Sequence, residues 1–107
     1  MKILSGIEVT EISWCDVNLT VLSWENDGRD LILKWNLHNK QKGVLKCLWA
    51  SSINISLKTV KNEGGLPLTF DANFQQQTQG WDVIFNFGSR GTIEFMCNEL
   101  MLETENS

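Results

Sequence analysis

The chain has 107 residues, of which 42% are hydrophobic and 21% charged, and its formal net charge is −4. This length accommodates one ordinary domain, and the apolar content is too high for intrinsic disorder. The composition includes five tryptophans but only one histidine. A single histidine removes most routes to general acid–base catalysis.

The first elements in chain order are two strands, residues 19–24 and 31–37, joined by the turn at residues 26–29. Apolar side chains alternate with polar ones along the second strand, which is typical of a half-buried strand, and an Asp-Gly turn favours a tight hairpin. The register that groups the apolar residues pairs Glu25 with Asp30, Trp24 with Leu31, and Leu22 with Leu33. We expect these apolar side chains to face the core.

A polar, lysine-rich connection at residues 39–43 leads to the next strand, and a further alternating strand covers residues 53–57. The predicted pairs across this connection are His38 with Val44, Leu37 with Leu45, Trp35 with Cys47, and Leu33 with Trp49. The segment 61–67 breaks the pattern with two glycines and the one proline. Residues 71–80 are polar and glutamine-rich, and we expect a loop or a poorly determined edge there.

The last hairpin joins residues 81–87 to residues 91–97 through Gly88-Ser89-Arg90. Its predicted pairs are Phe87 with Gly91, Phe85 with Ile93, Val83 with Phe95, and Trp81 with Cys97. The alternation changes phase after Cys97, and a β-bulge near Asn98 and Glu99 would return Leu100 and Leu102 to the inward face. We expect residues 103–107 to be a frayed acidic tail.

Six to eight antiparallel strands with short polar turns predict an all-β fold for residues 1–107. The expected architecture is a single-domain antiparallel β-sandwich or a small barrel, built from consecutive hairpins. The four tryptophans on predicted strands, Trp24, Trp35, Trp49 and Trp81, are expected to pack in the core. The alternation breaks immediately after Trp14, so Trp14 is the tryptophan that we most expect to be partly exposed.

No apolar run approaches the roughly 18 residues of a membrane span, and Glu8 and Glu11 interrupt any signal-peptide core. The three cysteines, Cys15, Cys47 and Cys97, are odd in number and lack a Cys-x-x-Cys spacing. We therefore expect buried, reduced thiols, a cytoplasmic protein and no contact with a membrane.

Catalytic and metal-binding patterns are absent from the sequence. His38 lies at a predicted strand end with no nucleophile or orienting carboxylate in a recognisable setting. The acids around the first turn lack the spacing of a calcium-binding loop, and Gly64-Gly65 lacks the following Lys-Ser or Lys-Thr of a phosphate-binding loop. We expect a protein that is not an enzyme, with no catalytic residues, no metal and no cofactor.

Charge is distributed unevenly, with six lysines and no acid between residues 34 and 61. One hypothesis is a nucleic-acid-binding β domain that uses Lys34, Lys40, Lys42 and Lys46. The interleaved tryptophans face inward in the predicted register, whereas base stacking needs exposed rings. We therefore favour a solvated basic edge that guards against strand addition. A small-ligand-binding β-barrel is a further alternative, which an internal cavity would support.

The acidic residues suggest a surface that attracts a basic protein partner, because complementary charge raises association rates. The candidate partner-binding residues are Trp14, Glu25, Asp27, Asp30, Glu94 and Glu99. Trp14 would supply the aromatic anchor of such an interface.

The segments Trp24–Leu31, Gly80–Gly88 and Gly91–Cys97 resemble hairpins of small β-rich bacterial immunity proteins from polymorphic and contact-dependent toxin systems. The resemblance covers about half of the chain. It implies a non-enzymatic inhibitor that binds one cognate toxin and blocks its active site or substrate channel.

Overall fold

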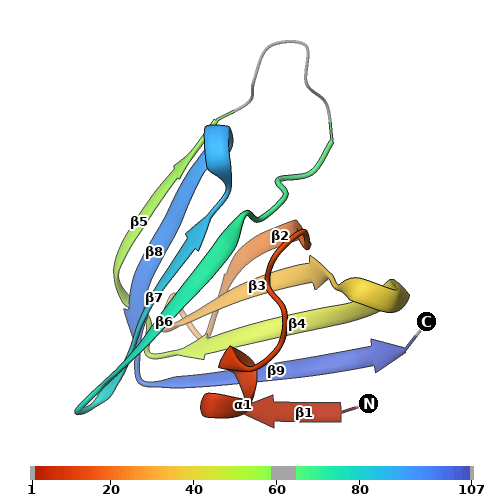
Figure 1. Ribbon diagram of the computed structural model, residues 1–107. Coiled ribbons are helices and arrows are strands. Elements are labelled where there is room, and N and C mark those ends of the chain that lie inside the picture. Colours follow the sequence, from red (N-terminus) through yellow and green to blue (C-terminus); the bar gives the residue numbers. More distant parts are fainter. Residues whose placement is uncertain (1, 59–64, 107) are drawn as a thin grey trace.

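The computed structural model describes residues 2–58 and 65–106, which form two antiparallel sheets (Figure 1). The five-stranded sheet has the order β1-β9-β4-β3-β2 and the four-stranded sheet the order β5-β8-β7-β6. The predicted all-β fold is confirmed, and of the two expected architectures the sandwich is the one observed, since the sheets form no closed barrel. Within the described residues, no helix is long and apolar enough to cross a membrane.

The strands of the five-stranded sheet are β1 (Lys2–Ser5), β2 (Asn18–Glu25), β3 (Asp30–Asn36), β4 (Gln41–Leu48) and β9 (Glu99–Asn106). Those of the four-stranded sheet are β5 (Ser51–Leu57), β6 (Asp71–Gln77), β7 (Gly80–Asn86) and β8 (Gly91–Cys97). The helical segments are α1 (Ile7–Thr10) and two short turns, η1 (His38–Lys40) and η2 (Gly88–Arg90).

Two paired strands pass from one sheet to the other at a single corner. β4 continues into β5 through Trp49 and Ala50, and β8 continues into β9 through Asn98. The backbone N–H of Asn98 donates to the Leu48 carbonyl at 2.8 Å, which ties the two crossings together. Figure 1 shows the four-stranded sheet rising steeply from this corner, away from the five-stranded sheet.

The registers predicted for the first and last hairpins are confirmed. Glu25 faces Asp30 in the β2–β3 pair, and Phe85 faces Ile93 in the β7–β8 pair. The phase change after Cys97 is also present, but it arises where the chain crosses between the sheets, and it leaves Leu100 buried as expected.

Two segments are more ordered than their composition indicated. Residues 71–77, expected as a loop or poorly determined edge, form the regular edge strand β6. The prediction of a frayed tail from Glu103 onward is wrong for residues 103–106. These residues belong to β9, which lies between β1 and β4 and pairs with both. Two neighbouring strands stabilise this segment in spite of its charge.

The predicted register between β3 and β4 is wrong by four residues, since Leu33 faces Leu45 and Trp35 faces Gly43. Asn39 and Lys40 both have φ near 60°, so η1 reverses the chain in fewer residues than expected. A Cβ atom on Gly43 would lie 2.6 Å from Leu37 Cδ1, and glycine therefore leaves the space that Leu37 needs. The shift is an even number, so Leu45 still faces the core, as alternation predicts.

The segment from α1 to residue 17 covers one open side of the sandwich and inserts Trp14 between the sheets. Trp14 is 5% exposed, and its ring centroid lies 5.2 Å from that of Trp35 and 5.4 Å from that of Phe85. Its indole N–H donates to the Val9 carbonyl at 2.8 Å, and the Thr69 hydroxyl donates to the Trp14 carbonyl. The prediction that Trp14 is an exposed anchor is wrong, because it is a core residue.

Candidate protein-binding surface

Trp24 and Trp49 are 49% and 57% exposed, although alternation placed both in the core. Trp24 does lie opposite the buried Leu31, but β2 is the outermost strand of the wider sheet. Trp49 lies at the corner with a φ of 55°, a conformation that bulky side chains rarely adopt, so it leaves the alternation of β4. The other two tryptophans expected inside, Trp35 and Trp81, are buried.

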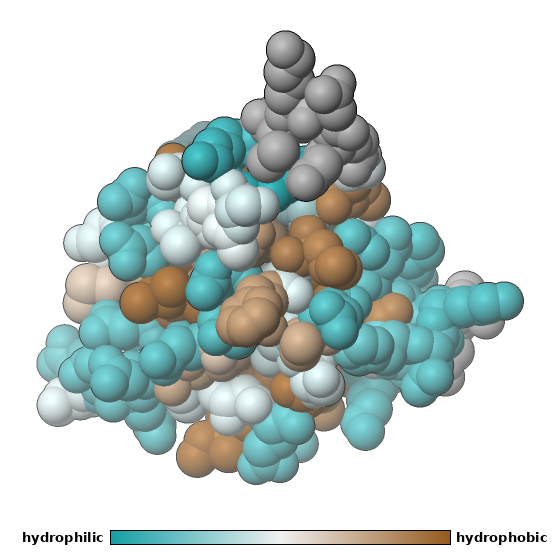
Figure 2. Space-filling view, turned by 45° about the horizontal axis from the view of Figure 1, so that its top comes forward, coloured by the Kyte–Doolittle hydropathy of each residue, from teal (hydrophilic) through white to brown (hydrophobic). Residues whose placement is uncertain are grey.

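Exposed apolar side chains elsewhere do not form a comparable aromatic site. Leu66, Leu68 and Phe70 project from the segment that leads into β6. Figure 2 shows one face of the molecule on which hydrophobic side chains occur in small groups separated by hydrophilic ones. Tryptophan is strongly enriched among residues that dominate binding energies, so the corner is the better candidate for an interface.

The carboxylate of Asp30 holds the corner and the first turn together. Its two oxygens accept hydrogen bonds at 3.1 Å from Nε and Nη2 of Arg29, and the Asn26 amide donates to one of them. The backbone N–H of Trp49 donates to Asp30 Oδ1 at 3.2 Å. Asp30 is 2% exposed, so its proposed role as a partner-binding residue is wrong, since its charge is satisfied within the chain.

The first turn also contacts the exposed rings themselves. The guanidinium carbon of Arg29 lies 4.6 Å from the centroid of the Trp49 ring, and the Arg29 carbonyl accepts a hydrogen bond from Ala50 at 2.9 Å. A Cβ on Gly28 would lie 3.9 Å from Trp24 Cδ1, so Trp24 packs beside the same turn. Rings that are held in place lose less entropy when a partner binds.

Three of the predicted partner-binding acids lie at this corner. Glu25 and Asp27 are exposed at the first turn, and Glu99 is exposed opposite Leu48, immediately after the crossing. We define the corner surface as Trp24, Glu25, Asp27, Trp49 and Glu99. The one nearby cation named above, Arg29, already pairs with Asp30, so this surface is acidic.

Glu94 does not belong to the corner surface. It lies on β8 in the four-stranded sheet, where its Oε1 accepts a hydrogen bond from the Asn54 amide at 3.4 Å. Glu94 is therefore separated from the acids at the first turn, although the sequence grouped them by charge.

The pKa of Asp30 is lowered from 3.8 to about 2, first of all by the hydrogen bonds from Arg29. As the pH falls, the Asp30 carboxylate therefore takes up a proton at a higher pH in the unfolded chain than in the folded one. The stability that the charged Asp30 contributes is complete above about pH 4 and is lost as the pH falls toward about 2. We expect Asp30→Asn to remove that part of the acid dependence of the unfolding free energy. Chemical denaturation across this range measures it, with Asp27→Asn as the matched control. Parallel profiles for wild type and Asp30→Asn would contradict the prediction.

The lysines of the nucleic-acid hypothesis are interleaved with acids. Lys46 pairs with Glu103 at 3.0 Å, and Lys42 lies opposite Glu105. β4 is an interior strand, so the interpretation of Lys42 and Lys46 as part of a basic edge is wrong. Lys34 is exposed on β3 and Lys40 on η1, while Lys61 lies outside the described residues. This mixed face offers no feature that favours nucleic acid over protein.

The thiols and the histidine differ in their exposure to solvent. Cys47 and Cys97 are buried as expected, and burial raises the pKa of the Cys47 thiol well above its ordinary value. Cys15 is exposed, contrary to expectation. His38 is also exposed, and its Nε2 lies 2.9 Å from the Cys15 carbonyl. In the described part of the chain, no three His, Cys, Asp or Glu side chains gather as a metal site.

No protein-family model, curated protein or solved structure matches the chain. The geometry and charge of the corner surface are therefore the features that bear on function.

Proposed function

We propose that this protein is a non-enzymatic binding module that recognises a basic protein partner through the corner surface. The observation that carries the proposal is the pair of half-exposed tryptophans, of which Trp49 is held by Asp30 and Arg29 and Trp24 packs beside the first turn that carries Glu25 and Asp27. Rigid aromatic anchors supply most of the binding energy in many interfaces, and the surrounding acids would raise the association rate and select a basic partner.

The more specific form of the proposal is an immunity protein that neutralises a cognate toxin by direct binding. Its support is the resemblance of the first and last hairpins to immunity proteins, together with the acidic corner. If the toxin is a nuclease, Glu25 and Asp27 would occupy the groove that binds nucleic-acid phosphates, because carboxylates can pair with the cations that line it.

Replacing Trp24 and Trp49 together with alanine is expected to weaken partner binding by about 1,000-fold, because each truncation of a central anchor costs roughly 2 kcal/mol. The partner is first identified by affinity purification from the source organism, with wild type and the double variant as parallel baits. Affinities for the purified partner are then measured by calorimetry. Phe70→Ala is the matched control, since Phe70 is 67% exposed but lies outside the corner surface. Equal affinities for wild type and the double variant would refute the proposed surface.

The charge argument and the toxin argument have separate tests. Glu25→Lys combined with Asp27→Lys is expected to slow association and to flatten its dependence on salt, whereas an unchanged association rate would exclude electrostatic steering. Co-expression with a toxin encoded beside this protein tests immunity. Survival that depends on Trp24 and Trp49 would support it, while binding to a partner that is not toxic would leave only the general binding module.

A further inference from the structure

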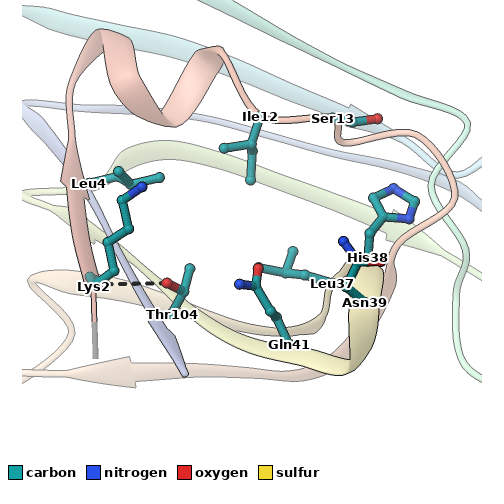
Figure 3. A pocket seen from close by; sticks show the side chains of 9 residues that line it. All are labelled: Lys2, Leu4, Ile12, Ser13, Leu37, His38, Asn39, Gln41 and Thr104. Atoms are coloured by element: carbon teal, nitrogen blue, oxygen red, sulfur yellow. Dashed lines mark hydrogen bonds between the residues drawn. The ribbon is translucent and has the colours of Figure 1, made fainter. Parts of the chain in front are cut away.

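A pocket of about 230 Å³ opens at the end of the sandwich opposite the corner, between the N-terminal segment and the five-stranded sheet (Figure 3). Three apolar side chains from separate parts of the chain, Leu4, Ile12 and Leu37, line it. The polar lining residues are Lys2, Ser13, His38, Asn39, Gln41 and Thr104. Polar residues therefore outnumber apolar ones in the lining, and the site suits a small ligand that has both a polar and an apolar part.

Figure 3 shows how the lining side chains are directed. Ile12 points into the pocket from above, and the amides of Gln41 and Asn39 point toward its interior. The amine of Lys2 lies beside Leu4, while the His38 ring and the Ser13 hydroxyl point away from the pocket. The interior is therefore apolar on one side and offers hydrogen-bonding groups and one cation on the other.

The charge of this pocket is opposite to that of the whole protein. None of the residues that line it is acidic, although the chain carries 13 acids. Glu103 and Glu105, which flank Thr104, alternate with it on β9 and face the outer side of the sheet, where Glu103 pairs with Lys46. Within the described part of the chain, the amine of Lys2 has no ion-pair partner.

Contacts between neighbouring strands hold the walls of the pocket in place. Leu37 occupies space that only a glycine at position 43 leaves, because a Cβ there would lie 2.6 Å from Leu37 Cδ1. The Thr104 hydroxyl donates to the Lys2 carbonyl at 3.4 Å, which holds the end of β1 against β9. The strands β1, β4 and β9 form one side of the pocket, and side chains on strands are held more precisely than those on loops.

We propose that this pocket binds a small amphipathic monoanion, a carboxylate with a short aliphatic chain. The aliphatic chain would contact Leu4, Ile12 and Leu37. The carboxylate would pair with the amine of Lys2 and accept a hydrogen bond from the Asn39 amide. The volume is below the range of about 300–1,000 Å³ typical of drug-sized ligands, so the ligand is small. This proposal does not depend on the proposed partner binding, since the corner surface lies on different residues.

The test uses hexanoate, hexanol and hexylamine, which share one chain length and differ in charge. Hexanoate is expected to shift the methyl resonances of Leu4, Ile12 and Leu37 with a Kd on the order of 1 mM, a value suited to so small a ligand. Hexanol and hexylamine are expected to bind at least several-fold more weakly. Equal binding of hexanol would overturn the assignment of an anion site, and the absence of localised shifts with hexanoate would overturn the site itself.

Two variants connect the binding to the pocket. Lys2→Gln is expected to weaken hexanoate binding about tenfold, since a hydrogen bond to a charged group is worth more than a neutral one. Ile12→Phe fills the pocket and is expected to abolish binding, with thermal unfolding as the check that the variant folds. Lys34→Gln is the matched control, because Lys34 is exposed on a different strand. Equal effects of Lys2→Gln and Lys34→Gln would overturn the role of Lys2.

Discussion

Replacing Trp14 with alanine is expected to lower the free energy of unfolding by about 4 kcal/mol, because it leaves a large cavity between the sheets. The ring is 5% exposed and contacts Trp35, Phe74 and Phe85, and its N–H is paired with the Val9 carbonyl. This loss is a large share of the roughly 5–15 kcal/mol that stabilises a typical domain. Chemical denaturation of the purified variant measures it.

The same experiment separates a core residue from an interface anchor. Trp49→Ala is the matched control, since Trp49 is 57% exposed and its truncation should change stability by less than about 1 kcal/mol. If Trp14→Ala kept wild-type stability, Trp14 would not pack as the structure shows.

Replacing Gly91 with alanine is expected to cost on the order of 3 kcal/mol, because it combines backbone strain with a steric clash. Gly91 has a φ of +117°, and a Cβ atom would lie 1.7 Å from the Ser56 carbonyl oxygen. Relief of that clash requires β5 to move away from β8, which breaks the edge of the four-stranded sheet. Thermal and chemical unfolding measure the loss.

Gly88→Ala is the control for this substitution. Gly88 also has a positive φ, +62°, but no atom lies within 4 Å of the position of its Cβ. Its cost should be limited to the conformational strain of about 1–2 kcal/mol. Equal losses for the two variants would show that the approach of β5 to Gly91 is not the dominant effect.

Alternation predicted the fold class and two hairpin registers because each depends on local information. The Asn-Asp-Gly-Arg turn and the η2 turn fix which residues face each other. The alternation of side chains along each strand then determines which residues face the core. The β3–β4 register failed because the length of its turn depends on two residues in left-handed conformations, Asn39 and Lys40, which composition does not reveal. The error was four residues, so parity was preserved.

The candidate surface was harder to predict. Alternation along a strand indicates which face of the sheet a side chain occupies, but not whether another part of the chain covers that face. Trp24 lies on the correct side of an edge strand and is still half exposed. Trp49 was assigned to a strand, whereas it marks the place where the chain leaves one sheet for the other. The acids beside a tight turn did indicate a binding surface at this place in the sequence. The role of Asp30 as a buried hydrogen-bond acceptor could be seen only in the structure.

The pairing of β1 with β9 has a consequence for synthesis. Lys2 lies opposite Thr104, so β1 has no partner strand until β9, 102 residues later in the sequence, has been synthesised. At about 5–20 residues per second, β1 would wait several seconds or longer with its backbone unpaired. Other strands, such as β2 and β3, can pair from their own hairpin during that time. A chaperone that binds nascent chains would therefore find β1 unpaired for longer than β2 or β3.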